Sequence, residues 1–251
     1  MESPSPYFFT AQWPVLYCDN HLLALYKPAG LLIQGDRTGD PTLIDLARQW
    51  IKEKYHKPGL VFLGLVHRID RPVAGVVLFG RTTKAAGRLS DQFRCGRTKK
   101  KYLAVLEGVP ARPSGRLVNQ VERHGASGRV VDTAGETSRQ AALSFRVLDK
   151  NGFRSLVEVD LETGRHHQIR LQFAHIGHPV LGDLRYGASA PLDKKQIALF
   201  AAELTVTHPT TGLELTLTAP LPRGWPWPGL PATAAPLPWN WQDISGILDK
   251  L

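Results

Sequence analysis

The residues best suited to chemistry lie in a charged stretch, His67–Arg71, between two apolar runs, Leu60–Val66 and Val73–Phe79. Apolar runs of this length are typical of strands buried on both faces, which places the charges in the connection between them. An unpaired buried carboxylate is costly, so Asp70 should have a cationic partner. A capping or surface ion pair is the ordinary role for a single aspartate, and a reactive carboxylate is the alternative.

A second polar segment, Thr163–Asp183, holds four of the nine histidines of the chain. The acceptable zinc ligands in it are His167, His175, His178 and Asp183. Their spacing matches no regular ligand pattern, and the neighbouring Arg165 and Arg170 would repel a cation. We therefore predict no metal site here, although a metal-dependent hydrolase stays a rival interpretation.

A third segment concentrates positive charge without any acid between Asp91 and Glu107. It contains Arg94, Arg97, Lys99, Lys100 and Lys101. The whole chain of 251 residues carries 31 Lys and Arg against 22 Asp and Glu, a formal charge of +9. This balance favours a polyanionic partner, with nucleic acid first, and the cationic run would then contact phosphates; a merely solvated loop is the alternative.

Several functions lose support because their motifs are absent. No two glycines are separated by one residue and no Lys precedes Ser or Thr, which excludes the dinucleotide fingerprint and the Walker A loop. No apolar run is long enough to span a membrane. The only cysteines, Cys18 and Cys95, lie far apart, and no Lys or Arg precedes Lys27. We expect a cytoplasmic protein with free thiols.

The elements that must position these groups predict an α+β fold. The expected strands are 22–26 and 31–34 joined by a tight turn, then 60–66, 73–79, 102–107, 143–148 and 153–161, with a last hairpin formed by residues around 206 and by 213–217. Apolar residues at helical spacing predict helices from Thr42 to Ile51 and over 82–93. We expect an N-terminal arm at 1–14, a body at 15–220 and a Pro/Trp-rich segment at 221–251 packed on that body.

Five motifs occur together in order. They are Lys27–Gly30, Gly64–Arg71 followed by Gly75, Lys101–Val105, Gly164–Arg170, and Ala174–Asp183 with Tyr186 and Gly187. Together they resemble the RluA-type RNA pseudouridine synthases over about residues 15 to 220. The chain departs from the family pattern at Ile69, Val73, Ala74 and His166, and none of these changes removes a group that the chemistry requires.

The resemblance implies a pseudouridine synthase fold, a mixed and largely antiparallel sheet with flanking helices and loops. It implies an isomerase that converts specific uridines of ribosomal or transfer RNA to pseudouridine without a cofactor. Asp70 would be the essential aspartate, acting as base or nucleophile, with Arg170 as its cationic partner. Tyr102 would stack on the base and assist proton removal from C5. Arg68 would fill the gap left by the flipped base, and Leu199 would line the uracil pocket.

Further expectations follow from the same resemblance. His67 and Arg71 would also contact substrate, and substrate choice would depend on loops such as Arg112–Arg139. With only about twenty residues before the catalytic body, we expect no S4-type RNA-binding domain. Structured RNA is the expected partner of a monomer that needs no other protein and no membrane. A catalytically inactive RNA-binding protein on the same fold is the alternative, which the retention of Asp70, Tyr102 and Arg170 disfavours.

Overall fold

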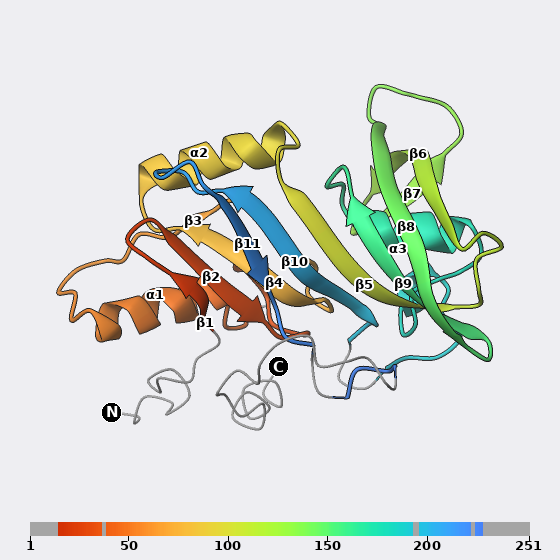
Figure 1. Cartoon of the computed structure of the whole chain (residues 1–251), viewed down its shortest axis with the longest axis horizontal. Helices are drawn as coiled ribbons and strands as arrows, with labels where there is room; N and C mark the ends of the chain where they lie inside the picture. The colour runs from red at the N-terminus through yellow and green to blue at the C-terminus, as the bar shows by residue number, and fades with distance from the viewer. Residues whose placement is uncertain (1–14, 37–38, 193–195, 222–223, 228–251) are drawn as a thin grey trace.

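In the described part of the chain, three helices pack against one bent sheet (Figure 1). The structure, a computed structural model, describes residues 15–36, 39–192, 196–221 and 224–227. Its strands are β1 (Val15–Cys18), β2 (Leu22–Lys27), β3 (Gly64–Leu65), β4 (Ala74–Gly80), β5 (Lys99–Glu107), β6 (Ser114–His124), β7 (Ser127–Val131), β8 (Arg139–Asn151), β9 (Arg154–Leu161), β10 (Leu199–Thr207) and β11 (Glu214–Thr218). The helices are α1 (Leu43–Lys54), α2 (Thr83–Arg94) and α3 (Gln168–His175), with a 3₁₀ turn, η2, at Leu184–Tyr186.

The strand order is β1-β2-β4-β10-β5-β9-β8-β6-β7, with β11 beside β10 and β3 beside β4. Every pairing among the described strands is antiparallel except that of β4 with β10. The predicted α+β class with a mixed, largely antiparallel sheet is therefore confirmed. In the described residues no helix is both long and apolar enough to span a membrane.

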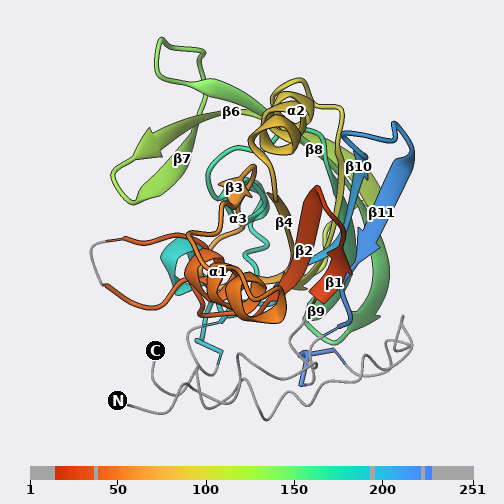
Figure 2. The same cartoon turned by 90° about the vertical axis from the view of Figure 1, so that its left-hand side faces the viewer.

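Alternating side chains of β2 and β4 build a core on each face of the sheet. Leu23 and Val77 belong to the cluster that includes α1, whereas Leu22 and Val76 belong to the cluster that includes Leu89 of α2. Period-two alternation explains this division, because successive side chains of a strand point to opposite faces. Figure 2 shows the result, with α1 and α2 on either side of β2 and β4.

The parallel contact between β4 and β10 depends on a glycine. Gly75 lies opposite Ala201 with φ of +133°, and a Cβ built on it would lie 2.2 Å from the Ala201 carbonyl oxygen. No other residue fits so close a backbone approach. This packing brings the loop that ends at β4 next to the first residues of β10, and so sets the distance between the two strands that flank the functional site.

Most predicted elements are confirmed. The expected strand at 22–26 is β2, that at 73–79 is β4, and the helices over 42–51 and 82–93 are α1 and α2, each capped by a threonine side chain. The predicted hairpins are β8–β9 and β10–β11. Thr42 and Thr82 accept hydrogen bonds from the backbone three residues on, as helix N-caps do.

Three expectations about the backbone are wrong. Residues 31–34 form no strand beyond one bridge between Leu32 and Thr42, because β2 pairs with β1 and β4 instead. The strand expected at 60–66 is only Gly64–Leu65, and Leu60 is fully exposed. The stretch Arg112–Arg139, expected as loops, is largely the β6–β7 hairpin, which projects from the body in Figure 2.

The predicted N-terminal arm, residues 1–14, lies outside the described residues, as do 222–223 and 228–251 of the Pro/Trp-rich segment. Within the described part, Trp227 is 5% exposed, and its Nε1 donates to Asp149 Oδ2 at 3.0 Å. Trp225 packs against both cores. The domain division itself stays a prediction.

Candidate active site

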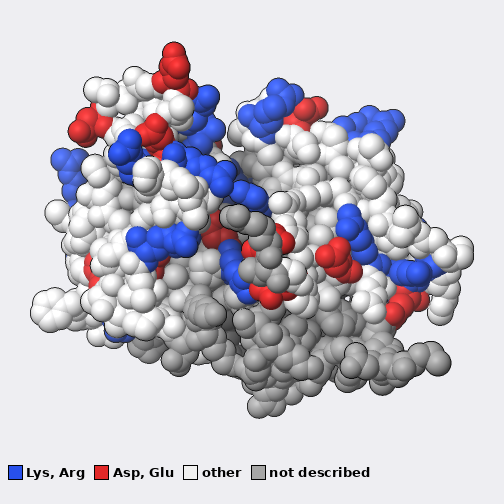
Figure 3. Space-filling view, turned by 180° about the vertical axis from the view of Figure 1, so that it is seen from behind, with Lys and Arg blue, Asp and Glu red and all other residues white. Residues whose placement is uncertain are grey.

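A pocket of about 780 Å³ lies where four segments meet: the loop before β4, the end of α2, β5, and the segment leading into α3. Its lining includes Arg68, Ile69, Asp70, Phe93, Arg94, Cys95, Lys100, Tyr102, Thr163, Arg165, His167, Arg170 and Leu199. Seen from behind, the molecule is hollowed between its two halves, and Lys and Arg side chains gather along the hollow (Figure 3). The two polar segments singled out in the sequence, His67–Arg71 and Thr163–Asp183, therefore both contribute residues to one cavity.

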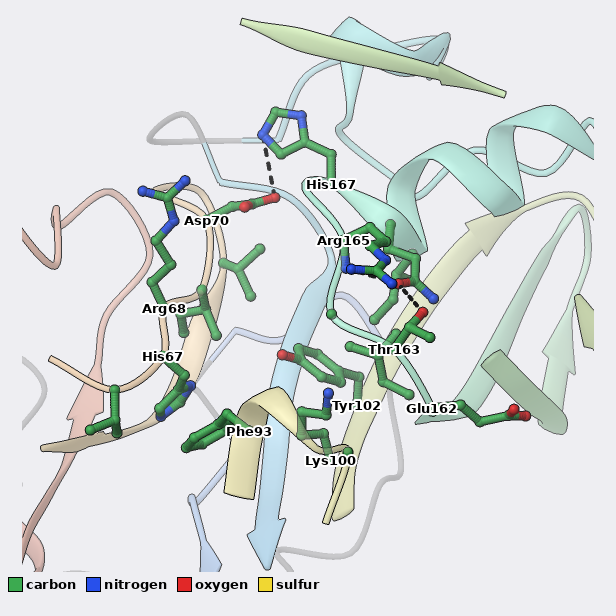
Figure 4. A pocket seen from close by; sticks show the side chains of 18 of the residues that line it. His67, Arg68, Asp70, Phe93, Lys100, Tyr102, Glu162, Thr163, Arg165 and His167 are labelled. Atoms are coloured by element: carbon green, nitrogen blue, oxygen red, sulfur yellow. Dashed lines mark hydrogen bonds and ion pairs between the residues drawn. The ribbon is translucent and has the colours of Figure 1, made fainter. Parts of the chain in front are cut away.

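Asp70 is the acidic centre of this pocket. Its Oδ2 accepts a hydrogen bond from Arg170 Nη1 at 3.0 Å, and His167 Nε2 lies 3.5 Å away. The Asp70 side chain is 26% exposed, whereas that of Arg170 is 6% exposed. The carboxylate therefore faces the cavity while its cationic partner is buried behind it. Figure 4 shows Asp70 and His167 directed toward one another at one end of the pocket.

A second carboxylate fixes Arg170 from the other side. Arg170 Nε and Nη2 donate to the two oxygens of Asp183 at 2.6 and 2.9 Å, and the Asp183 side chain is 2% exposed. Burial alone would lower the pKa of Arg170, but Asp183 and Asp70 together raise it. The guanidinium is thus permanently charged and held in one plane, which makes it a rigid donor to Asp70.

His167 supplies a second polar group to Asp70. Burial lowers the pKa of His167 to about 3, although Asp70 opposes the shift, so the imidazole is neutral near pH 7. Because a carboxylate only accepts, the ring proton belongs on Nε2, and Nδ1 then accepts from the Tyr186 hydroxyl at 2.7 Å. Tyr186 in turn accepts from the Gly128 amide at 3.1 Å. A chain of hydrogen bonds therefore runs from β7 to the His167 ring, whose Nε2 lies 3.5 Å from the Asp70 carboxylate.

The backbone at His167 is unusual. Its φ of 54° lies in the left-handed region, which non-glycine residues adopt only where the surroundings enforce it. His166 stacks on it with ring centroids 3.7 Å apart. This conformation starts α3 and turns the His167 ring back toward Asp70.

β5 divides the cationic run between two faces. Lys100 and Tyr102 line the pocket. Lys99 pairs with Glu214 at 3.1 Å and Lys101 with Glu158 at 3.3 Å. The expected run of phosphate contacts is therefore split: by strand alternation, Lys99 and Lys101 point away from the cavity that Lys100 enters.

The other predicted residues fall into two groups. Arg68, Arg94 and Leu199 line the pocket, as expected for substrate contacts. Arg97 is exposed but is not among the lining residues. The Arg71 guanidinium turns away from the cavity, donating to Gly30 O at 2.9 Å and pairing with Asp40 at 2.7 Å. It holds two loops together.

His67 also has a structural contact. Its Nε2 accepts the Leu78 amide at 2.9 Å, its ring stacks on Phe93 with centroids 4.6 Å apart, and burial, aided by Lys100, lowers its pKa to about 3. His67 is therefore a neutral part of the pocket wall. Substrate contact by His67 or Arg71 stays a prediction.

Sequence reasoning assigned no role to Lys27, which is fully buried under the Asp70 loop. Its ammonium donates to the carbonyl oxygens of Pro28, Leu31 and Arg71 at 2.9, 2.8 and 3.0 Å. The bond to Arg71, the residue after Asp70, ties the loop to β2. The motif Lys27–Gly30 contained the signal, because a lysine at the end of an apolar run needs internal acceptors.

The pH dependence of stability tests this assignment. Burial lowers the pKa of Lys27 to about 7, against an ordinary value of 10.5, with Asp70 opposing and Arg71 adding to the shift. Between these values the unfolded chain binds more protons, so the unfolding free energy should rise with pH. From pH 7 to 10, the unfolding free energy of wild type, measured in urea, should rise relative to that of Lys27→Met by a few kcal/mol. The rise should be about 1.4 kcal/mol per pH unit at most.

The exposed Lys57 provides the control, since the unfolding free energy of Lys57→Met should change with pH in the same way as that of wild type. A constant difference between wild type and Lys27→Met across that range would contradict the assignment.

His167, Asp183 and Tyr186 were present in the sequence motifs without an assigned role beyond possible zinc ligation. In the structure Asp183 pairs with Arg170, and His167 contacts Tyr186 and Asp70. His178 Nδ1 lies 3.2 Å from the Glu107 carbonyl oxygen. In the part of the chain that the structure describes, no three His, Cys, Asp or Glu side chains come together as metal ligands.

The chain is similar to known proteins over most of its length. A family model described as RNA pseudouridylate synthase matches residues 21–175. The chain is 33% identical over 227 residues to ribosomal large subunit pseudouridine synthase D of Xylella fastidiosa, covering 83% of this chain and 66% of that protein. It is 31% identical to ribosomal large subunit pseudouridine synthase C of Buchnera aphidicola, with 82% and 67% covered. The chain spans about two thirds of the length of these relatives.

A solved structure shows the same fold. The human RNA pseudouridylate synthase domain containing 4 superposes with a TM-score of 0.71 at 24% identity, covering 84% of this chain and 89% of that chain. This similarity bears on the fold alone.

Proposed function

Because the chain belongs to the RNA pseudouridylate synthase family, we propose that it isomerises specific uridines of structured RNA to pseudouridine. One observation carries the proposal: Asp70 faces a cavity, held at 3.0 Å by an arginine that a second, buried carboxylate immobilises. Such a preorganised carboxylate suits attack at, or proton removal from, the sugar carbon C1′. The names of the relatives favour ribosomal RNA as substrate, with transfer RNA as the other class.

The reaction breaks the N1–C1′ bond of uridine, turns the base and forms a C5–C1′ bond. C5 loses a hydrogen and N1 gains one, so the product is an isomer and no co-reactant is consumed. Asp70 acts as base or nucleophile, and Arg170 stabilises its charge. Burial and the Asp70 carboxylate raise the pKa of Tyr102 well above its usual value, so its hydroxyl is protonated near pH 7 before substrate binds. The roles proposed for Tyr102 are stacking on the base and assistance in proton removal from C5.

Base flipping brings the uridine to this site. Leaving the stack costs a few kcal/mol, and filling the vacated space offsets part of that cost. Arg68, exposed at the rim two residues before Asp70, suits this task because its guanidinium is planar and rich in donors. Leu199, 4% exposed on β10, offers an apolar wall to the uracil ring.

We further propose a monomer that acts in the cytoplasm without a protein partner. Of the cationic run, Arg94 and Lys100 line the pocket, which supports their proposed contact with the strand that carries the target. Arg97 stays a predicted phosphate contact.

Gene deletion tests the proposal. Pseudouridines in ribosomal and transfer RNA are mapped chemically in the wild type, the deletion strain, and strains complemented with wild type or Asp70→Asn. We expect at least one site to vanish on deletion and to return only with wild type. A deletion strain with an unchanged map, or full rescue by Asp70→Asn, would refute the function; the latter result would instead favour an RNA-binding role.

A further inference from the structure

Two cations, Lys100 and Arg165, line the same pocket as Asp70. Lys100 projects from β5 on the same face as Tyr102, and a Cβ built on Gly164 would lie 3.6 Å from its Nζ. The ammonium therefore lies over the backbone of the residue that precedes Arg165. Figure 4 shows Lys100 and Arg165 beside Tyr102 and Thr163, on the wall across from His67 and Arg68.

Arg165 is held in place through its backbone amide and its Nε. Its amide donates to Gln168 Oε1 at 3.0 Å and its Nε donates to the Gln140 carbonyl at 2.9 Å. Gln168 is itself held by Thr163 at 2.7 Å. Among the described residues no partner is bonded to the terminal nitrogens of Arg165, so the far edge of an oriented guanidinium is open to the pocket.

Neither cation has an acidic partner in the described part of the chain. The acids nearby are already paired: Glu162 is bound through both oxygens by Arg116, Glu158 by Lys101 and Arg146, and Asp70 by Arg170. Burial lowers the pKa of Lys100, and the charge of Arg165 lowers it further. Two like charges that line one pocket without an acidic partner favour an anion there.

We propose that Lys100 and Arg165 form a phosphate seat that binds a phosphodiester group flanking the flipped uridine. The inference rests on the proposed function and adds which backbone contact fixes the nucleotide. A guanidinium edge gives two parallel donors to phosphate oxygens, and the ammonium adds a point charge. Anchoring the phosphate here would hold the sugar in register with Asp70.

The three consecutive lysines allow a sharp test. We compare pseudouridine formation by wild type, Lys100→Met, Lys99→Met, Lys101→Met and Lys84→Met, the last changing an exposed residue at the opposite end of α2 from Arg94. Losing a charged hydrogen bond should raise KM for RNA about tenfold to a hundredfold in Lys100→Met. Lys99→Met and Lys101→Met should lose far less, Lys84→Met should match wild type, and Lys100→Arg should retain most of the affinity.

An RNA oligonucleotide with one methylphosphonate, placed on either side of the target uridine, identifies the contact. One of the two positions should weaken binding to wild type more than it weakens binding to Lys100→Met, since in the variant the methylphosphonate removes only the remaining Arg165 contact. The slope of log affinity against log salt should also fall by about 0.7 in Lys100→Met.

The two hypotheses fail differently. If wild type forms no pseudouridine on any RNA, the proposed function fails. If wild type is active but Lys100→Met behaves like Lys99→Met, or the methylphosphonate and Lys100→Met effects add in full at both positions, only the phosphate seat is overturned. Urea unfolding of each variant checks that a loss of affinity does not come from a loss of fold.

Discussion

Replacing Asp70 with asparagine should lower the rate of pseudouridine formation by about a thousandfold or more, while RNA affinity changes less than about threefold. The amide keeps the size of the side chain and can still accept from Arg170, so geometry survives and only the reactive charge is lost. The side chain is 26% exposed, and its loss should cost the fold no more than about 1 kcal/mol. Single-turnover assays on target RNA and urea unfolding measure the two effects.

Asp40 is the matched control. It also pairs with an arginine, Arg71, at 2.7 Å, and its side chain is 29% exposed. Asp40→Asn removes a carboxylate of similar exposure outside the pocket, and its activity should stay within about threefold of wild type. Activity above a tenth of wild type in Asp70→Asn would show that this carboxylate is not the reacting group.

The second large effect should come from Arg170→Met, which leaves Asp183 buried without its cation. Breaking a buried ion pair from one side costs about 3–5 kcal/mol, because the remaining charge is desolvated and unpaired. Asp183 is 2% exposed and receives two hydrogen bonds from Arg170, so the upper part of this range is expected. Urea unfolding should show the loss, and activity should fall with it.

A double variant separates the two roles of Arg170. Arg170→Met with Asp183→Leu removes both charges, and a buried ion pair replaced by apolar side chains is often tolerated. We expect most of the stability to return while activity stays low, because Asp70 still lacks its donor. Recovery of activity together with stability would mean that Arg170 serves the fold alone. A stability loss below about 1 kcal/mol in the single variant would contradict the buried charge pair.

Helices α1 and α2 were predicted because their buried residues are apolar and recur at helical spacing. Helix α3 was not predicted, because its buried residues do not follow such a pattern. Helix α3 buries Gln168, Arg170 and Gln172 as well as its apolar residues. The Gln172 amide donates to Asn119 Oδ1 at 2.7 Å and contacts two backbone carbonyls in β6 and β8. A helix whose buried face is polar has no hydrophobic period to detect.

The strand expected at 60–66 was wrong because an apolar run was taken as evidence of burial. Its apolar residues are not all inside, since Leu60 is fully exposed and Phe62 is 49% exposed. Residue type alone cannot report this, because burial is decided by the elements that pack nearby. The strand expected at 31–34 failed for a different reason: the Leu31 carbonyl accepts from the buried Lys27 instead of a neighbouring strand.

For the site, residue type and motif order predicted which groups meet but not how each is directed. Asp70, Tyr102, Arg170, Arg68 and Leu199 all line one cavity. The same reasoning could not separate Arg68 from Arg71, or Lys100 from its two neighbours. Those distinctions depend on acceptors far along the chain, such as Asp40, Glu158 and Glu214.

The position of Cys95 has a practical consequence. This exposed thiol closes α2 and lines the pocket, whereas Cys18 is partly buried and contacts Arg81 and Tyr55. The two cysteines thus differ in accessibility without any engineering. Cys95 is a native attachment point at the pocket mouth for a fluorophore or crosslinker, from which the arrival and departure of an RNA strand can be followed in real time.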